Sequence, residues 1–185
     1  MRCDLTWALD RVRQCLSITG ALACLLFAGC AGAEDSDSMD HKTPQQAAAD
    51  FLPQVEAVAS ALSIERESFE LRANRCEGAQ GETRDDHFYL WVGLRGRAPA
   101  GDIAAQIEAA HTRWQAQGWD ITRFRRLDNG GVNLTATDPA SGNTYTLDSG
   151  FKPAPDAYLA AFFNTPCFQS PEGKVAFGEL HLPPG

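Results

Sequence analysis

The chain has 185 residues, of which 44% are hydrophobic and 22% are charged, and this composition is ordinary for a soluble globular protein. The formal net charge is −8 and no block of basic residues occurs. This disfavours a nucleic-acid partner, because binding to phosphates needs clustered Lys and Arg. The length predicts one domain.

The first 30 residues have the pattern of an export signal. Arg11 and Arg13 precede an uncharged stretch, residues 15–29, which is shorter than the ~20 residues that a membrane-spanning helix needs. The stretch leads into Leu26-Phe27-Ala28-Gly29-Cys30. This segment resembles the lipobox of bacterial lipoprotein signal peptides.

The resemblance implies that residues 1–29 are a signal peptide and that Cys30 becomes a lipidated N-terminus. A lipid on Cys30 with two or more acyl chains would anchor the chain stably to a membrane of the cell envelope. The folded part would then face outside the cytoplasm. An ordinary cleaved signal or an uncleaved anchor is the alternative, and Met1 and Val12 are both candidate starts of translation because the segment before the apolar stretch is long.

The cysteine count predicts one disulfide. Of the six cysteines, three lie in the signal peptide, at Cys3, Cys15 and Cys24, and Cys30 is the lipidation site. Only Cys76 and Cys167 remain, and an exported protein meets an oxidising compartment. We therefore expect a Cys76–Cys167 disulfide. The alternative is a catalytic thiol, for which the sequence offers no adjacent base.

Residues 30–42 are acidic and small and show no apolar periodicity, so we expect a flexible spacer. A single domain is expected over residues 43–170, followed by a C-terminal tail, residues 171–185. The domain begins with Thr43-Pro44 and Gln46, which is the signature of a helix capping box. Pro53 then interrupts the helical spacing, which indicates a kink or, alternatively, the start of a second helix.

Beyond the first helix, apolar residues occur at every second position. Alternation predicts a strand over residues 69–76 and a second over 87–95, with a loop between them. A second helix is expected over residues 102–117, with Gly118 as its C-cap. Three more strands should form a meander, separated by turns at Asp128-Asn129-Gly130-Gly131 and within residues 138–143.

Residues 156–163 are ambiguous, because the alanines allow a helix while the aromatic residues suit a strand. We interpret this segment as a strand, since a strand returns Cys167 to the sheet. The predicted fold class is α+β, an antiparallel sheet of about five strands with two helices packed on one face. The disulfide ties the first strand to the last.

Few residues suggest chemistry. Glu108 and His111 have a spacing on one helix that would let both touch a metal ion, but a di-metal site needs a second such pair, so we expect solvated surface residues. The run Asp85-Asp86-His87 is interpreted as a polar turn, because consecutive strand residues point to opposite faces. Neither a metal nor a cofactor is predicted.

Arg123, Arg125 and Arg126 form a small basic cluster that suits a phosphate or sulfate or, as we prefer, a solvated hairpin. No Gly-x-Ser-x-Gly, His-Glu-x-x-His, phosphate-binding glycine loop or Cys-x-x-Cys motif occurs in the sequence. We therefore predict that the protein is not an enzyme. An envelope hydrolase ranks third among the functional hypotheses.

The aromatic residues are more numerous than one sheet face needs, and they include Trp91, Trp114, Trp119, Tyr89, Phe162 and Phe163. We single out Trp91, Trp114 and Trp119 as a candidate interaction surface, since aromatic residues concentrate at interfaces, while a buried core is the alternative. The function predicted first is a lipoprotein with a non-enzymatic protein-binding or accessory role toward another envelope protein. The second is a carrier or sensor of a small apolar or lipidic ligand, which requires a cavity between sheet and helices.

Overall fold

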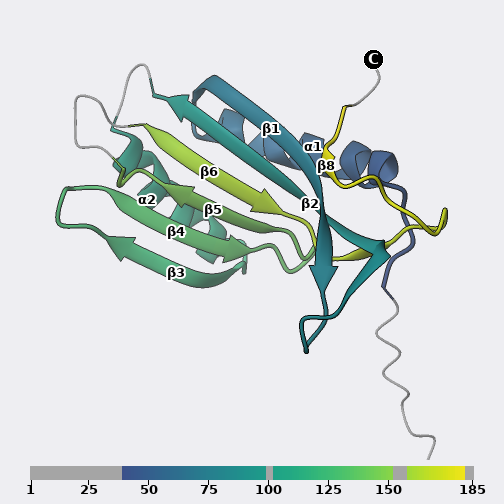
Figure 1. Cartoon of the computed structure of the whole chain (residues 1–185). Helices are drawn as coiled ribbons and strands as arrows, with labels where there is room; N and C mark the ends of the chain where they lie inside the picture. Colours follow the sequence, from purple (N-terminus) through teal and green to yellow (C-terminus); the bar gives the residue numbers. More distant parts are fainter. Residues whose placement is uncertain (1–38, 99–101, 152–157, 182–185) are drawn as a thin grey trace, which may run out of the picture. The chain divides into compact units, whose positions relative to one another are not determined.

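The computed structural model describes residues 39–98, 102–151 and 158–181 (Figure 1). The expected signal peptide, the lipidation site Cys30 and most of the expected spacer lie outside these residues. The described part contains two helices and one antiparallel sheet.

Helix α1 spans Pro44–Ala61 and begins with the predicted capping box. The Thr43 hydroxyl accepts a hydrogen bond from the Gln46 N–H (3.2 Å), and the Gln46 side-chain oxygen accepts one from the Thr43 N–H (2.9 Å). Pro53 lies inside this single helix, so the alternative of a second helix starting there is wrong. The buried stripe of α1 comprises Ala47, Ala48, Phe51, Val55, Val58 and Ala59.

Strands β1 (Glu65–Glu77) and β2 (Thr83–Arg97) form a hairpin that is longer than the alternation predicted. The interpretation of residues 85–87 as a polar turn is wrong, because all three lie in β2. Their side chains bond within the sheet: Asp85 pairs with Arg75 of β1 (2.7 Å), and Asp86 bonds Arg84 and His87 of its own strand and Gln169 of β7. The turn is only five residues long and contains Gly81, whose φ of 80° suits glycine.

Helix α2 spans Ile103–Ala116 and agrees with its prediction. The Asp102 side chain accepts a hydrogen bond from the Ala104 N–H (2.9 Å) at the N-terminus. Gly118 follows the C-cap residue Gln117 with a φ of 79°, the left-handed conformation that commonly ends a helix.

The meander is also confirmed, with β3 at Asp120–Arg126, β4 at Val132–Thr137 and β5 at Thr144–Asp148. The ambiguous segment forms strand β6, Leu159–Asn164, so the helical alternative is wrong. Two very short strands follow, β7 at Phe168–Gln169 and β8 at Gly178–Glu179.

The sheet runs in the order β3-β4-β5-β6-β2-β1-β8, and β7 pairs with the end of β2. The prediction of about five strands is therefore wrong, since the sheet has eight. Strands β7 and β8 have two residues each, which is too short to leave an alternating pattern in the sequence. The mixed architecture of an antiparallel sheet with two helices is confirmed.

Both helices lie on the same face of the sheet, and Figure 1 shows them behind the strands. Alternate residues of β2, such as Leu90 and Val92, point to this side and are fully buried. They share one core with Phe51 of α1 and Ile107 of α2. The opposite face of the sheet carries no helix in the described residues, and we call it the open face.

The folded domain extends beyond its predicted limits, residues 43–170. The segment expected as a C-terminal tail forms β8 and buries Val175, whose N–H donates to the Asp85 carbonyl oxygen (3.0 Å). At the other end the Gln169 N–H donates to the Asp40 carbonyl oxygen (3.0 Å) within the expected spacer. Main-chain hydrogen bonds hold both segments, and such bonds require no apolar pattern in the sequence.

Cys76 at the end of β1 and Cys167 just before β7 are paired in a disulfide, as the cysteine count predicts, with an S–S distance of 2.06 Å. The bond joins the first long hairpin to the C-terminal part of the domain. Among the helices that the structure describes, none is long and apolar enough to cross a membrane.

Candidate functional site

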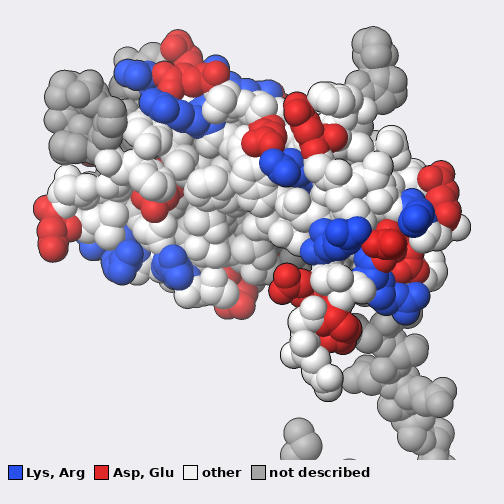
Figure 2. Space-filling view, viewed as in Figure 1, with Lys and Arg blue, Asp and Glu red and all other residues white. Residues whose placement is uncertain are grey.

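The open face presents uncharged side chains from the middle strands of the sheet. These are Trp91 and Gly93 of β2, Ala160 and Phe162 of β6, and Thr144 and Thr146 of β5. Figure 2, drawn from the same side as Figure 1, shows charged residues mainly at the margins and an uncharged strip across the centre. The open face thus has the composition of a binding surface, an uncharged centre with a charged rim.

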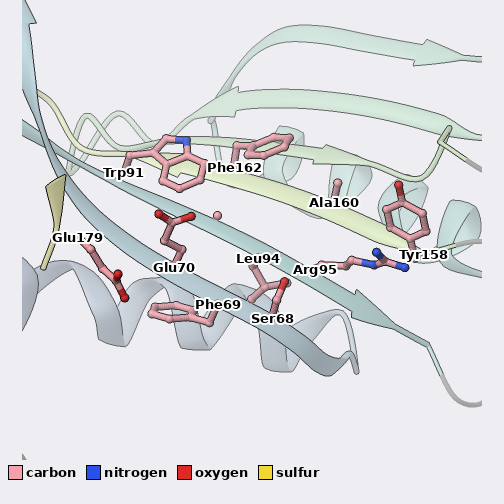
Figure 3. Close-up of a pocket in the computed structure, with 11 residues that line it drawn as sticks. Ser68, Phe69, Glu70, Trp91, Leu94, Arg95, Tyr158, Ala160, Phe162 and Glu179 are labelled. Carbon is pink, nitrogen blue, oxygen red and sulfur yellow. The ribbon is translucent and has the colours of Figure 1, made fainter. Parts of the chain in front are cut away.

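Trp91 and Phe162 lie side by side at the centre of the open face, with ring centroids 6.0 Å apart and planes inclined by 25° (Figure 3). Phe162 is 37% exposed and Trp91 is half-buried. A side chain at position 93 would overlap the indole of Trp91, so the ring lies directly over Gly93. We call Trp91 and Phe162 the aromatic platform.

A surface groove of about 470 Å³ runs beside the aromatic platform. Its other walls come from Ser68 and Glu70 of β1, Arg95 of β2, Tyr158, and Glu179 of β8. In Figure 3 Glu70 and Glu179 lie toward the Trp91 end, while Arg95 and Tyr158 lie together at the other end. The groove therefore joins an apolar floor to polar ends.

Most charges along this groove are paired with neighbours. Glu70 contacts Arg72 (2.9 Å), and Arg95 contacts Glu67 (3.0 Å) while its guanidinium lies 4.1 Å from the centroid of the Tyr158 ring. Such exposed pairs contribute at most about 1 kcal/mol each to stability. Their main effect here is to hold the side chains in place along the groove.

Threonines continue the open face over β4 and β5. Thr135 and Thr146 share a hydrogen bond of 3.2 Å, and Thr137 and Thr144 share one of 3.1 Å. Each hydroxyl keeps further capacity to accept a hydrogen bond. The face is therefore aromatic over β2 and β6 and polar over β4 and β5, where Asp148 at the end of β5 supplies one charge and accepts a hydrogen bond from the Asn133 side chain (2.9 Å).

The three tryptophans singled out from the sequence do not share one surface. Trp91 lies on the open face. Trp114 belongs to α2, and its side chain is 2% exposed in the core between this helix and the sheet. Trp119 stacks on Trp114 with a centroid distance of 4.7 Å, and both rings contact Tyr145. The chain reverses at Gly118, directly after α2, and this reversal brings Trp119 onto the helix side of the sheet.

The predicted interaction surface omits two residues that lie beside Trp91 on the open face, Phe162 and Gly93. Phe162 appears in the list of aromatic residues, and the alternation of β6 separates it from the buried Leu159, Ala161 and Phe163. Gly93 stands two residues after Trp91 in the same strand. A glycine inside a strand can mark such a close approach.

Glu108 and His111 do not converge on a common point for a metal ion. The Glu108 carboxylate accepts a hydrogen bond from Arg126 (2.6 Å), which lowers the pKa of Glu108. The His111 ring instead stacks on Phe124, with centroids 3.8 Å apart. Both residues tie α2 to β3, and Arg123 and Arg125 are exposed on β3.

Asp86 is the most strongly perturbed carboxylate of the described residues. Arg84 donates two hydrogen bonds of 3.1 Å to it, His87 Nδ1 lies 2.9 Å away, and Gln169 donates one of 3.0 Å. The Arg84 bonds first, and then His87 and Gln169, hold the pKa of Asp86 far below its ordinary value of 3.8. The cluster fastens β7 to β2.

Within residues 39–98, 102–151 and 158–181, no three or more His, Cys, Asp or Glu side chains are grouped so that they could hold a metal ion. No protein-family model, no curated protein and no solved structure matches this chain.

Proposed function

We propose that this chain is a membrane-anchored extracytoplasmic lipoprotein with a non-enzymatic, protein-binding or accessory role toward another protein of the cell envelope. The anchor would be a lipid on Cys30, and the sequence of residues 15–30 supports it. The Cys76–Cys167 pair is consistent with this location, because disulfides persist in oxidising compartments.

The aromatic platform is the observation that carries the binding role. Phe162 and Trp91 keep part of their surface in water on the open face. Aromatic side chains are enriched at protein interfaces and often supply a large share of the binding energy. The paired charges along the groove suit the polar rim of such an interface.

The alternative role, a carrier of a small apolar ligand, needs a cavity between the sheet and the helices. Phe51, Leu90 and Ile107 occupy that layer and are almost completely buried. The grooves beside the aromatic platform and beside α1 lie at the surface instead. We therefore favour binding of a protein on the open face.

Site-specific photocrosslinking tests this role in the intact envelope. A photoreactive p-benzoylphenylalanine replaces Phe162 in one variant of the full chain and Ala109, which is exposed on α2, in a control variant. We expect a defined crosslinked protein from position 162 and none from position 109. Equal products from both positions, or none from either, would contradict the proposed surface.

The anchor has its own test, the intact mass of the protein from the native membrane fraction. We expect a mass that begins at Cys30 and is raised by acyl chains, with a further increase of about two protons on reduction of the disulfide. A mass that retains the leader would contradict the anchor.

A further inference from the structure

The outer edge of β1 is only partly covered. Strand β8 pairs with Arg72 and Ala73, and among the described residues no strand pairs with the edge between Glu65 and Glu70. The Leu180 N–H donates to the Leu71 carbonyl oxygen (2.8 Å), so Leu71 directs its main chain away from β2. Because main-chain groups of a strand alternate in direction, Phe69 directs its N–H and carbonyl the same way.

A groove flanks this edge on each face of the sheet. On the helix side a groove of about 500 Å³ is bordered by Leu52 and Pro53 of α1 and by Phe69, which is 38% exposed. On the open face Ser68 and Glu70 border the groove beside the aromatic platform. Phe69 thus lines both grooves, whereas its neighbours Ser68 and Glu70 line only the groove of the open face.

This arrangement matches the side-chain alternation of an added strand, whose successive residues would enter the two grooves in turn. We propose that the edge of β1 around Phe69 accepts an extended segment of the partner protein as an additional strand of the sheet. In this mode main-chain hydrogen bonds supply affinity, and pockets for alternate side chains supply specificity. The inference rests on the proposed protein-binding role and names how that role is performed.

The two grooves also define the chemistry of the segment. Leu52, Pro53 and Phe69 make the helix-side groove largely apolar beside an ion pair between Glu56 and Arg66, so it takes Val, Ile or Leu. The open-face groove holds Glu70, which is paired with Arg72, and Glu179, whose side chain is 63% exposed and lies 4.0 Å from the His181 ring. A Lys or Arg fits there, with its methylene groups near Trp91 and its charge near the carboxylates. The segment thus alternates aliphatic and basic residues.

Two other occupants of the edge would compete with a partner. Residues 182–185 follow β8 in the sequence, but they include Pro183 and Pro184, which lack the N–H that strand pairing needs. A second copy of the chain could also pair through β1. This edge begins with the charged residues Glu65, Arg66 and Glu67, which are followed by Ser68 and Phe69, and such charges on an edge strand oppose pairing between identical edges.

The test uses the disulfide-bonded full chain in detergent and the peptide acetyl-Thr-Val-Lys-Val-Lys-Leu-Thr-amide. Two matched control peptides carry N-methyl groups, one on the odd-numbered amides and one on the even-numbered amides. Only one of these two sets faces the protein in a strand ladder. Affinity is measured by isothermal titration calorimetry, and hydrogen exchange of the Phe69 amide is followed by NMR.

We expect saturable binding of the parent peptide, unchanged binding of one methylated peptide, and a loss of about tenfold or more for the other. Exchange at Phe69 should slow by about tenfold when the parent peptide is bound, because its N–H becomes paired. Equal binding of both methylated peptides, or unchanged exchange at Phe69, would overturn the proposal.

Two further outcomes would assign the edge to other occupants and also overturn it. Binding that appears only after deletion of residues 182–185 would mean that the chain covers its own edge. If the Phe69 amide is protected from hydrogen exchange in the absence of peptide, and this protection increases as the protein dimerises, the edge belongs to a second copy of the chain. If the peptide does not bind but position 162 still crosslinks to a protein, only the strand-addition proposal is wrong and the proposed protein-binding function stands. If position 162 gives no crosslink, the protein-binding function is wrong as well.

Discussion

Removal of the disulfide should destabilise the domain strongly. Cys76 and Cys167 are 91 residues apart, so their bond closes a long loop in the unfolded chain. The chain-entropy model gives an upper estimate of about 4.5 kcal/mol for a loop of this length. A domain of this kind is stable by only about 5 to 15 kcal/mol, so the loss would be a large share of the total.

The assay is urea unfolding of Cys76→Ala, Cys167→Ala and the double variant, together with the unchanged protein with and without reductant. We expect each single variant, the double variant and the reduced protein to lose about the same free energy of unfolding, because all four lack the same bond. Reductant should not change the double variant. Unequal losses in the single variants, or a double loss equal to their sum, would refute the reasoning.

Three further predictions concern the fold. Ile107→Ala should lower the free energy of unfolding by about 2 to 5 kcal/mol in a urea titration, because Ile107 is completely buried between α2 and the sheet; a loss within measurement error would contradict that packing. Thr43→Ala should lower the free energy of unfolding by about 1 kcal/mol in the same titration, because the helix cap is lost. The control Gln45→Ala, at an exposed position of the first turn, should cost less, because alanine is the better helix former. Equal losses in the two variants would contradict the cap. Asp86 is held ionised in the folded state by Arg84, His87 and Gln169, so its stabilising effect should be present above its ordinary pKa of 3.8 and fade as the pH falls toward the lower folded value. Unfolding measured between pH 5 and pH 2 should therefore show a smaller loss of stability in Asp86→Asn than in the unchanged protein, and identical pH profiles would contradict this role.

Local patterns account for the elements that the sequence predicted well. The capping box needs only Thr43, Pro44 and Gln46, which are neighbours in the chain, and the end of α2 needs only Gly118. The disulfide could be predicted because only two cysteines lie outside the expected leader and the expected lipidation site. The two helix ends depend on neighbouring residues alone and the disulfide followed from a cysteine count, so none of these predictions required the strand pairing to be known.

The elements that were missed depend on long-range pairing. Strand β7 forms where the main chain of Phe168 and Gln169 meets the N-terminal part of β2, and β8 forms where Gly178 and Glu179 meet β1. Neither segment has a periodic apolar pattern, because two residues cannot define a period. Their pairing was therefore invisible in the sequence.

The candidate site could be predicted only in part for a similar reason. Trp91 and Trp114 are chemically alike, yet one lies on the open face and the other in the core. Which of the two is buried depends on which face of the sheet the helices cover, and the local sequence pattern does not predict that face. The contact between Trp91 and Gly93 is the one feature of the site that spacing within a single strand could have revealed.

The central claim is that the aromatic platform is the docking surface, and Gly93→Ala tests it most directly. A methyl group at position 93 would overlap the Trp91 ring, which can swing away without disturbing the core on the other side of the sheet. The measurement is the crosslinking yield from p-benzoylphenylalanine at position 162, with and without Gly93→Ala, in protein that retains its thermal stability. We predict that the yield falls by about tenfold, as for loss of a central aromatic contact. An unchanged yield would contradict the claim that the aromatic platform binds the partner.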